Sequence, residues 1–209
     1  MLLPAAARAS IFTAPDLLER AITAMGGRAL LSRVKALHWS GRAQVEAGGR
    51  TLEIDVNTRV APFVRARTET RLVGSGDLRT LIIEPGGGWI ERNHTRTPLP
   101  AEQAVHERQQ YGLYGYMLLV RAPTHVVGDQ LVAERRGLPP VTFLMEGDAV
   151  MGADYAVASP DGVGSVAQRF LLEGELNDHG IRWPQTITIL QNDRLYFMLD
   201  LESFSVELA

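Results

Sequence analysis

The 209-residue chain contains no cysteine and only one lysine, Lys35. The absence of cysteine excludes a disulfide framework, a thiolate nucleophile and a cysteine-based zinc site. The formal net charge of -3 has the wrong sign for the basic surface that binds nucleic acid. No stretch reaches the roughly 18 apolar residues that span a bilayer. We therefore expect no transmembrane segment, no nucleic-acid partner and no redox chemistry.

Candidate catalytic and metal-binding groups are also sparse. No two of the five histidines stand at the spacing of a helical zinc pair, and no serine lies in a nucleophile elbow. Glu102 and His106 lie four residues apart, which fits two metal ligands, an acid–base dyad or a solvated helix face, but no third ligand can be identified. Glu53 and Asp55 fit the polar outside of a sheet better than a catalytic carboxylate pair. We expect no metal, no other cofactor and no enzymatic activity.

The N-terminus has the character of a processed leader. Residues 1–12 begin with an apolar run that ends in the small-x-small triplet Ala7-Arg8-Ala9, as at the end of a secretory signal peptide, although most of such a peptide is missing. We expect residues 1–12 to be a remnant of a signal peptide or a disordered N-terminus. Residues 13–209 are expected to form a single domain, because a chain of this length often folds around one core.

Apolar periodicity predicts one N-terminal helix and then mainly strands. Thr13 or Asp16 can cap the helix, and Gly26-Gly27 ends it. Alternating runs joined by glycine-rich turns then indicate a β-meander, and Gln191 to Arg194 predicts the turn of a C-terminal hairpin. The predicted strands are about eleven, at residues 37–46, 50–56, 63–72, 78–84, 89–90, 130–135, 141–145, 154–158, 166–176, 181–190 and 195–207.

The series of strands is interrupted once. After Thr97-Pro98-Leu99-Pro100, residues 101–120 lose the alternation and predict a helical segment. Gly112 and Gly115 each cost a helix roughly 1 kcal/mol, so we expect a bend or break near Leu113. The pattern as a whole indicates the α+β class with mostly antiparallel strands.

Large apolar side chains are concentrated on the predicted strands, and a curved open sheet places such residues on its concave face. If helices fill the concavity only partly, the remaining space is a hydrophobic pocket. The same residues also fit an ordinary core beneath a packed helix. The predicted ligand-binding residues are Trp39, Phe63, Trp89, Met117, Phe143, Met145, Trp183 and Phe197.

The final third of the chain carries a family resemblance. Gly174-Glu175-Leu176, then Gly180-Ile181-Arg182-Trp183-Pro184-Gln185-Thr186-Ile187, a polar turn and a last strand follow each other. Together with the order of the predicted elements, this segment resembles the LolA/LolB superfamily of bacterial periplasmic lipoprotein carriers. The Gly-x-x-x-Pro-x-x-Ile pattern is the most specific part of the resemblance.

The resemblance implies a strongly curved half-barrel of about eleven strands, with helices covering a concave face that holds an acyl chain. In this family LolA is a soluble shuttle for acylated lipoproteins and LolB is a membrane-anchored acceptor. The present chain lacks the lipobox cysteine of the acceptor. No residue matches the functional arginine of the shuttle, although Arg42, Arg65 and Arg67 lie on early strands where a polar anchor could sit.

We therefore predict a periplasmic binding or carrier protein for a lipid, an acyl chain or another hydrophobic ligand. Outer-membrane lipoprotein trafficking is one role, with a lipoprotein or membrane protein as partner. Two alternatives stay open: a structural or interaction module with a filled cavity, and a small hydrolase or isomerase that uses the cavity. An apolar pocket favours binding, a buried acid within it favours catalysis, and a filled interior favours the module. His38 is the histidine to inspect for an inward orientation.

Overall fold

The structure is a computed structural model that describes residues 14–209, and these residues form three helices and fifteen strands. The helices are α1 (Ala14–Ala24), α2 (Arg28–Leu31) and α3 (Ala101–Tyr116). The strands are β1 (Val34–Ala47), β2 (Arg50–Ala61), β3 (Arg65–Leu72), β4 (Leu78–Glu84), β5 (Gly87–Arg92), β6 (Thr95–Pro98), β7 (Thr124–Val127), β8 (Gln130–Ala133), β9 (Val141–Glu146), β10 (Ala149–Ala158), β11 (Ser165–Glu173), β12 (Leu176–Asp178), β13 (Ile181–Trp183), β14 (Thr186–Gln191) and β15 (Arg194–Leu208). The predicted leader at residues 1–12 and the candidate cap Thr13 lie outside the described residues.

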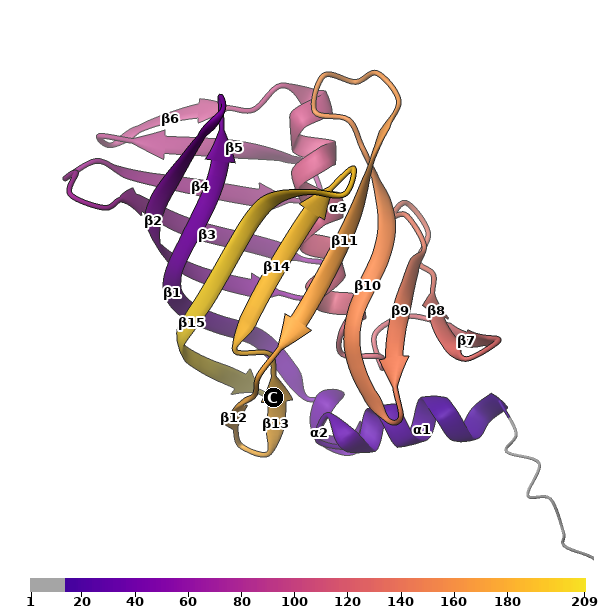
Figure 1. Cartoon of the computed structure of the whole chain (residues 1–209). Helices are drawn as coiled ribbons and strands as arrows, with labels where there is room; N and C mark the ends of the chain where they lie inside the picture. The colour runs from indigo at the N-terminus through magenta and orange to yellow at the C-terminus, as the bar shows by residue number, and fades with distance from the viewer. Residues whose placement is uncertain (1–13) are drawn as a thin grey trace, which may run out of the picture.

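Thirteen of these strands form one antiparallel sheet in the order β6-β5-β4-β3-β2-β1-β15-β14-β11-β10-β9-β8-β7. The sheet curls strongly on itself but stays open, with β6 and β7 as its two edges (Figure 1). The first long strand, β1, pairs with the last, β15, in the middle of the sheet. The fold is therefore a mostly antiparallel, curved half-barrel, as the sequence predicts.

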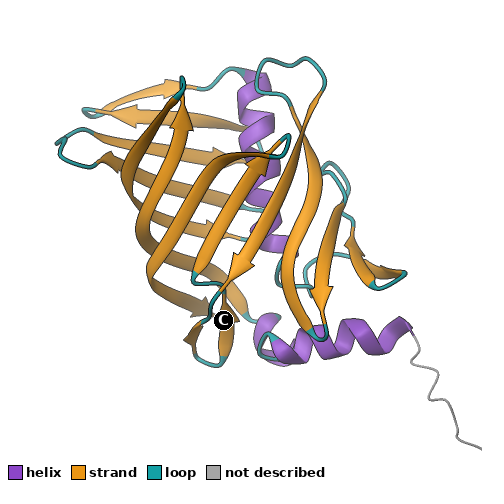
Figure 2. Cartoon of the chain, in the orientation of Figure 1, coloured by secondary structure: helices purple, strands orange, loops and turns teal. Residues whose placement is uncertain are grey.

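The helices occupy two different places. Helix α3 lies against the concave face of the sheet, whereas α1 and α2 lie across one end of it (Figure 2). Ala21 and Ile22 of α1 are fully buried, and the carbonyl of Met25 accepts a hydrogen bond from the amide of Arg182 at 3.1 Å. The interior is thus packed at the end covered by α1.

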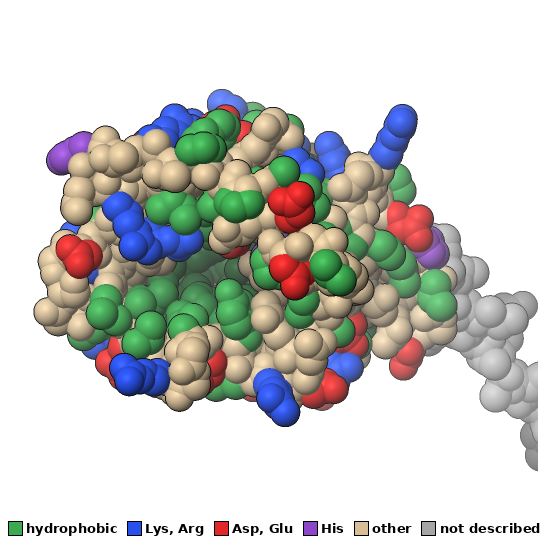
Figure 3. Space-filling model, turned by 90° about the horizontal axis from the view of Figure 1, so that it is seen from above, with side chains coloured by type: hydrophobic (Ala, Val, Ile, Leu, Met, Phe, Trp, Pro, Cys, Tyr) green, Lys and Arg blue, Asp and Glu red, His purple; other side chains and the backbone are tan. Residues whose placement is uncertain are grey.

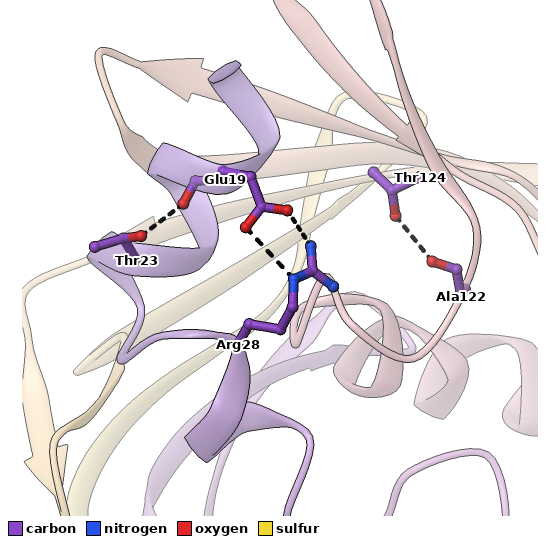
Figure 4. A network of polar contacts seen from close by, with 5 residues as sticks. All are labelled: Glu19, Thr23, Arg28, Ala122 and Thr124. Atoms are coloured by element: carbon purple, nitrogen blue, oxygen red, sulfur yellow. Dashed lines mark hydrogen bonds and ion pairs between the residues drawn. The ribbon is translucent and has the colours of Figure 1, made fainter. Parts of the chain in front are cut away.

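Polar contacts hold the first two helices together at their surface (Figure 4). The guanidinium of Arg28 forms an ion pair with Glu19 of α1. The hydroxyl of Thr23 donates a hydrogen bond to the carbonyl of Glu19 at 2.7 Å, and that of Thr124 to the carbonyl of Ala122 at 3.1 Å. Of these contacts only the exposed Arg28–Glu19 pair joins α1 to α2, and an exposed pair contributes only up to about 1 kcal/mol.

Several predicted elements differ from the observed ones. The short edge strands β6 and β7 were not predicted, and β10 begins five residues before the predicted strand, at Ala149. The run 166–176 is broken at Gly174, which has a φ of 66°. The run 181–190 is divided between β13 and β14 at Pro184, because proline has no amide hydrogen to donate to a ladder.

The expected bend in the helix at residues 101–120 is absent. Helix α3 runs without a break through Gly112 and Gly115 and ends at Tyr116. A Cβ on Gly115 would lie only 2.7 to 2.9 Å from the ring of Phe63, and one on Gly112 would lie 3.4 Å from the side chain of Leu138. Gly115 therefore allows a close approach between α3 and the β2–β3 turn, which is a packing role.

We expect Gly115→Ala and Gly112→Ala to have opposite effects on the free energy of unfolding. Alanine favours a helix by about 1 kcal/mol over glycine, which Gly112→Ala should largely gain, because it meets only the flexible end of Leu138. Gly115→Ala should instead lose about 1 to 3 kcal/mol by overpacking. Urea denaturation of the two variants measures the difference. Equal stability of the two would contradict the packing role of Gly115.

Candidate functional site

The space between α3 and the concave face of the sheet contains a cavity of about 350 Å³. Its opening lies at the end of the half-barrel opposite α1, where Figure 3 shows a hollow with hydrophobic side chains inside and arginine or lysine side chains near the rim. A cavity of this volume is at the lower end of the range of small-molecule sites. The candidate functional site is this cavity.

The sheet supplies an apolar wall. Every second side chain along a strand points to the same face of the sheet. The register aligns the inward side chains of several neighbouring strands. Val45 lies opposite Phe197, and Phe197 lies opposite Ile189. The apolar lining consists of Trp39, Val45, Ile54, Val56, Leu81, Phe170, Ile189, Phe197 and Leu199.

Helix α3 supplies a polar wall. Residues three and four apart share one side of a helix, and Gln103, Glu107, Gln110 and Tyr114 of α3 line the cavity at this spacing. The buried Nε2 of Gln110 has no hydrogen-bond partner within residues 14–209. The wall therefore presents at least one amide donor to a ligand.

Two groups from the sheet complete the polar wall. Arg79 of β4 and Tyr196 of β15 line the cavity together with Glu107. Burial raises the pKa of the Glu107 carboxyl, against the opposing effects of His106 and Arg79. Burial also raises the pKa of Tyr196, and the charge of Glu107 adds to that rise. The cavity therefore holds a carboxyl, a guanidinium and a phenol close together.

A chain of hydroxyl groups crosses the cavity below this pair. The hydroxyl of Thr58 donates to that of Thr68 at 3.1 Å, and the hydroxyl of Thr68 lies 2.6 Å from the phenol oxygen of Tyr111. Burial raises the pKa of Tyr111 well above its usual range, so its phenol stays neutral. The chain fixes the Tyr111 ring against the sheet.

An aromatic cluster forms the floor. The Trp39 ring centroid lies 4.7 Å from that of Tyr114 and 6.1 Å from that of Trp183. Trp183 in turn stacks on Phe204 with centroids 5.2 Å apart and planes within 2°. Trp183 is 1% exposed. The floor is therefore solid core that limits the depth of the cavity.

The predicted ligand-binding residues occupy different environments. Trp39 and Phe197 line the main cavity, and Phe63 lines a second cavity described below. Met117 and Trp183 border a small cavity of about 160 Å³ near the end of α1. Phe143 is fully buried, and Met145 is half-buried against the core. The ligand-binding role of these residues remains a prediction.

Trp89 lies on the other face of the sheet. It pairs with Ile82 of β4, whereas the neighbouring Leu81 faces the cavity. The guanidinium of Arg96 lies 4.3 Å above the Trp89 ring. Directly paired residues share a face, so Trp89 points away from the main cavity.

The residues considered as catalytic or metal-binding candidates lie largely outside the cavity. His38 is on the outer face, 3.8 Å from Glu207, and Asp55 is paired there with Arg42. His106 is 5% exposed, and its Nδ1 lies 2.7 Å from the carbonyl oxygen of Ala158. Within residues 14–209 no group of three or more histidine, aspartate or glutamate side chains could hold a metal ion.

The arginines considered as polar anchors, Arg42, Arg65 and Arg67, do not line the main cavity. Arg67 pairs with Glu69 and Arg65 with Glu84, while Arg79 lines the cavity. Sequence reasoning missed Arg79, although a signal exists: it alternates with Leu81 and Ile83 on β4 and so shares their face. The spacing of Glu107 on the helix does not identify it either, because polar helix residues have the same spacing whether they face solvent or a cavity.

Comparison with known proteins agrees with this architecture. No family model and no curated protein sequence matches the chain. Solved structures that match over nearly the whole chain include three bacterial proteins. A DUF1329 family protein from Desulfovibrio piger has a TM-score of 0.57 at 9% identity, with 93% of both chains covered. A LolA superfamily protein from Nitrosomonas europaea has a TM-score of 0.53 at 10% identity, with 95% of both chains covered.

The third structure is a domain described as an outer membrane lipoprotein-sorting protein from Vibrio parahaemolyticus. It has a TM-score of 0.53 at 5% identity and covers 93% of this chain and 92% of its own. The chain has a LolA-like fold. Identities this low show the LolA-like fold alone. In the part of the chain that the structure describes, no helix combines the length and hydropathy needed to cross a bilayer.

The raised pKa of Glu107 predicts a pH dependence of stability. Above the ordinary value of 4.5 the folded protein holds the Glu107 proton more tightly than the unfolded chain, so the free energy of unfolding falls as pH rises through this window. Glu107→Gln should remove this contribution and raise stability at pH 8. Urea denaturation between pH 4.5 and 8 tests the expectation, with Glu102→Gln, which removes an exposed carboxyl from the same helix, as control. A Glu107→Gln variant that follows the wild-type pH profile would contradict it.

Proposed function

We propose that the protein binds and carries a lipid, an acyl chain or another hydrophobic ligand in the cavity between α3 and the sheet. The observation that supports this function best is the apolar wall of a cavity of about 350 Å³. Such a cavity favours a binding protein over a module with a filled interior. The hollow seen in Figure 3 opens this cavity to solvent.

Burial of a chain supplies enough free energy for such binding. Each methylene removed from water contributes about 0.8 kcal/mol, so ten buried methylenes contribute about 8 kcal/mol before the cost of association. The polar wall of Gln103, Glu107, Gln110 and Arg79 offers hydrogen-bond partners to any polar group of the ligand that lies in this cavity. Affinity comes from the sheet and orientation from the helix.

The setting of this function is proposed from the LolA-like fold. One structure with this fold is described as an outer membrane lipoprotein-sorting domain, which supports outer-membrane lipoprotein trafficking as one role. In that role the protein works in the periplasm, and a lipoprotein or membrane protein loads or unloads it. The apolar run at residues 1–12 agrees with export.

A second candidate function rests on Glu107. A carboxyl with a raised pKa inside a cavity is a frequent property of catalytic acids, and Glu107 faces the same space as Arg79 and Tyr196. A hydrolase or isomerase acting on a small apolar substrate would use Glu107 as its acid. In a carrier, Glu107→Gln retains ligand uptake and release; in an enzyme it abolishes turnover of the bound ligand, which mass spectrometry of the recovered ligand detects.

The carrier function predicts a strong effect of charge on the apolar wall. Phe197→Asp places a carboxylate in the cavity and removes an aromatic side chain worth about 1.5 to 3 kcal/mol of burial, so uptake of a fluorescent fatty acid should weaken at least tenfold. Met198→Asp is the matched control, because Met198 is the next residue of β15, also half-buried, and faces outward opposite Gln44 and Thr188.

Both variants are compared by fluorescence titration after thermal unfolding has shown that they are folded. Similar affinities for folded Phe197→Asp and Met198→Asp would exclude this cavity as the binding site.

A further inference from the structure

A second cavity lies on the other side of Tyr111. It has a volume of about 290 Å³ and is bounded by α3, by the turns that join β2 to β3 and β4 to β5, and by the connection from β8 to β9. Its apolar lining includes Phe63, Ile83 and Leu138. The Phe63 ring is held edge-on by Tyr116, with centroids 5.1 Å apart. The second cavity therefore has an apolar base whose position is defined by the packing of Phe63 against Tyr116.

The charges around the second cavity are unbalanced. Four arginines line it, and only Arg65 is paired, with Glu84 at 3.2 Å. Within residues 14–209, Arg108, Arg135 and Arg136 have no carboxylate within ion-pair distance. Three guanidinium groups around apolar side chains attract an anion, and guanidinium geometry suits carboxylate and phosphate oxygens.

The positions of these arginines are defined to different degrees. Nη1 of Arg108 donates to the carbonyl of Pro85 at 2.8 Å, which leaves other N–H groups of the fork available. The guanidinium of Arg135 lies 4.3 Å above the Phe63 ring. Arg136 is exposed at the rim. Arg108 and Arg135 are thus oriented by the fold, and Arg135 and Arg136 are both exposed to solvent.

The main cavity differs in charge. There Arg79 shares the space with Glu107, whose carboxyl opposes it. An anionic group gains less binding free energy from a guanidinium that already faces a carboxyl than from guanidinium groups without a carboxylate partner. The charge distribution therefore places an anion in the second cavity and an apolar tail in the first.

The two cavities are consecutive parts of one trough. On β2, β3 and β4 the residues Val60, Ala66 and Ile83 line the second cavity, and the next inward residues, Thr58, Thr68 and Leu81, line the first. Residues two apart on a strand are separated by about 6.6 Å. Tyr111 lines both cavities, and its hydrogen bond to Thr68 closes the trough between them.

We propose that the two cavities form one site for a single-chain anionic amphiphile. The carboxylate or phosphate head binds among Arg108, Arg135 and Arg136, and the tail passes Tyr111 into the main cavity. This inference rests on the proposed function, since it names the chemical class of the hydrophobic ligand. Tyr111 then determines which chains pass, because its hydrogen bond to Thr68 must open to admit them.

Titration calorimetry with dodecanoate, dodecyl phosphate and 1-dodecanol tests the head-group site. The two anions should bind at least tenfold more tightly than the alcohol, and the tighter anion identifies the head. Arg108→Gln and Arg136→Gln should each weaken the anions about three- to tenfold and leave the alcohol unchanged. Arg42→Gln, on the outer face, is the matched control and should change neither.

Tyr111→Phe tests the connection between the cavities. It keeps the ring and removes the hydroxyl that bonds to Thr68, so hexadecanoate should gain affinity relative to dodecanoate. Thr68→Val removes the other partner and should produce the same shift. An unchanged ratio of hexadecanoate to dodecanoate affinity in both variants would overturn the connection.

The outcomes separate this inference from the proposed function. If the alcohol and both anions bind equally, and the arginine variants bind like the wild type, the anionic head-group site is excluded while the carrier function stands. If none of the three compounds binds, the carrier function itself fails.

Discussion

The cavity exists because one helix cannot fill the concavity of a thirteen-stranded sheet. Helix α3 has 16 residues and therefore a length of about 24 Å. Its C-terminal half, with Leu113, Tyr114 and Tyr116, is buried in the core together with α1. The N-terminal half faces the open end, where no other helix of residues 14–209 covers the sheet. Incomplete filling at one end, with dense packing at the other, leaves space for a ligand without loss of the core.

The same constraint explains the unusual composition of α3. A helix buried on most of its surface needs small residues where it approaches a neighbour closely, and Gly115 meets the Phe63 ring at such a point. It also needs polar groups where it faces the cavity mouth, and Gln103 and Glu107 occupy that side. The helix is therefore neither a plain amphipathic helix nor a hydrophobic one. Its sequence reflects three surroundings: core, turn and cavity.

Sequence patterns predicted the sheet more completely than the site. Alternation locates most strands, and the turn at Asn192 and Asp193, both with positive φ, follows from residues that tolerate that conformation. The four-residue edge strands β6 and β7 are too short for alternation to distinguish them from loops. Trp39 and Phe197 line the cavity, whereas Trp89 lies on the other face of the sheet. Alternation did not separate them, because it defines two faces without saying which one is concave. Glu107 was not identified as a cavity residue for a related reason, because polar helix residues have the same spacing whether they face water or a cavity.

The distribution of charge connects the fold to ligand chemistry. The outward arginines Arg42, Arg67 and Arg169 are each paired with a carboxylate on the same face. Inside the trough the arrangement differs, because Arg79 faces Glu107 while Arg108, Arg135 and Arg136 lack carboxylate partners within residues 14–209. Guanidinium groups without carboxylate partners offer hydrogen-bond donors and positive charge to an anionic group. The inner surface thus has arginines without carboxylate partners at one end and an apolar wall at the other. An amphiphile with an anionic head and an apolar tail has the complementary arrangement.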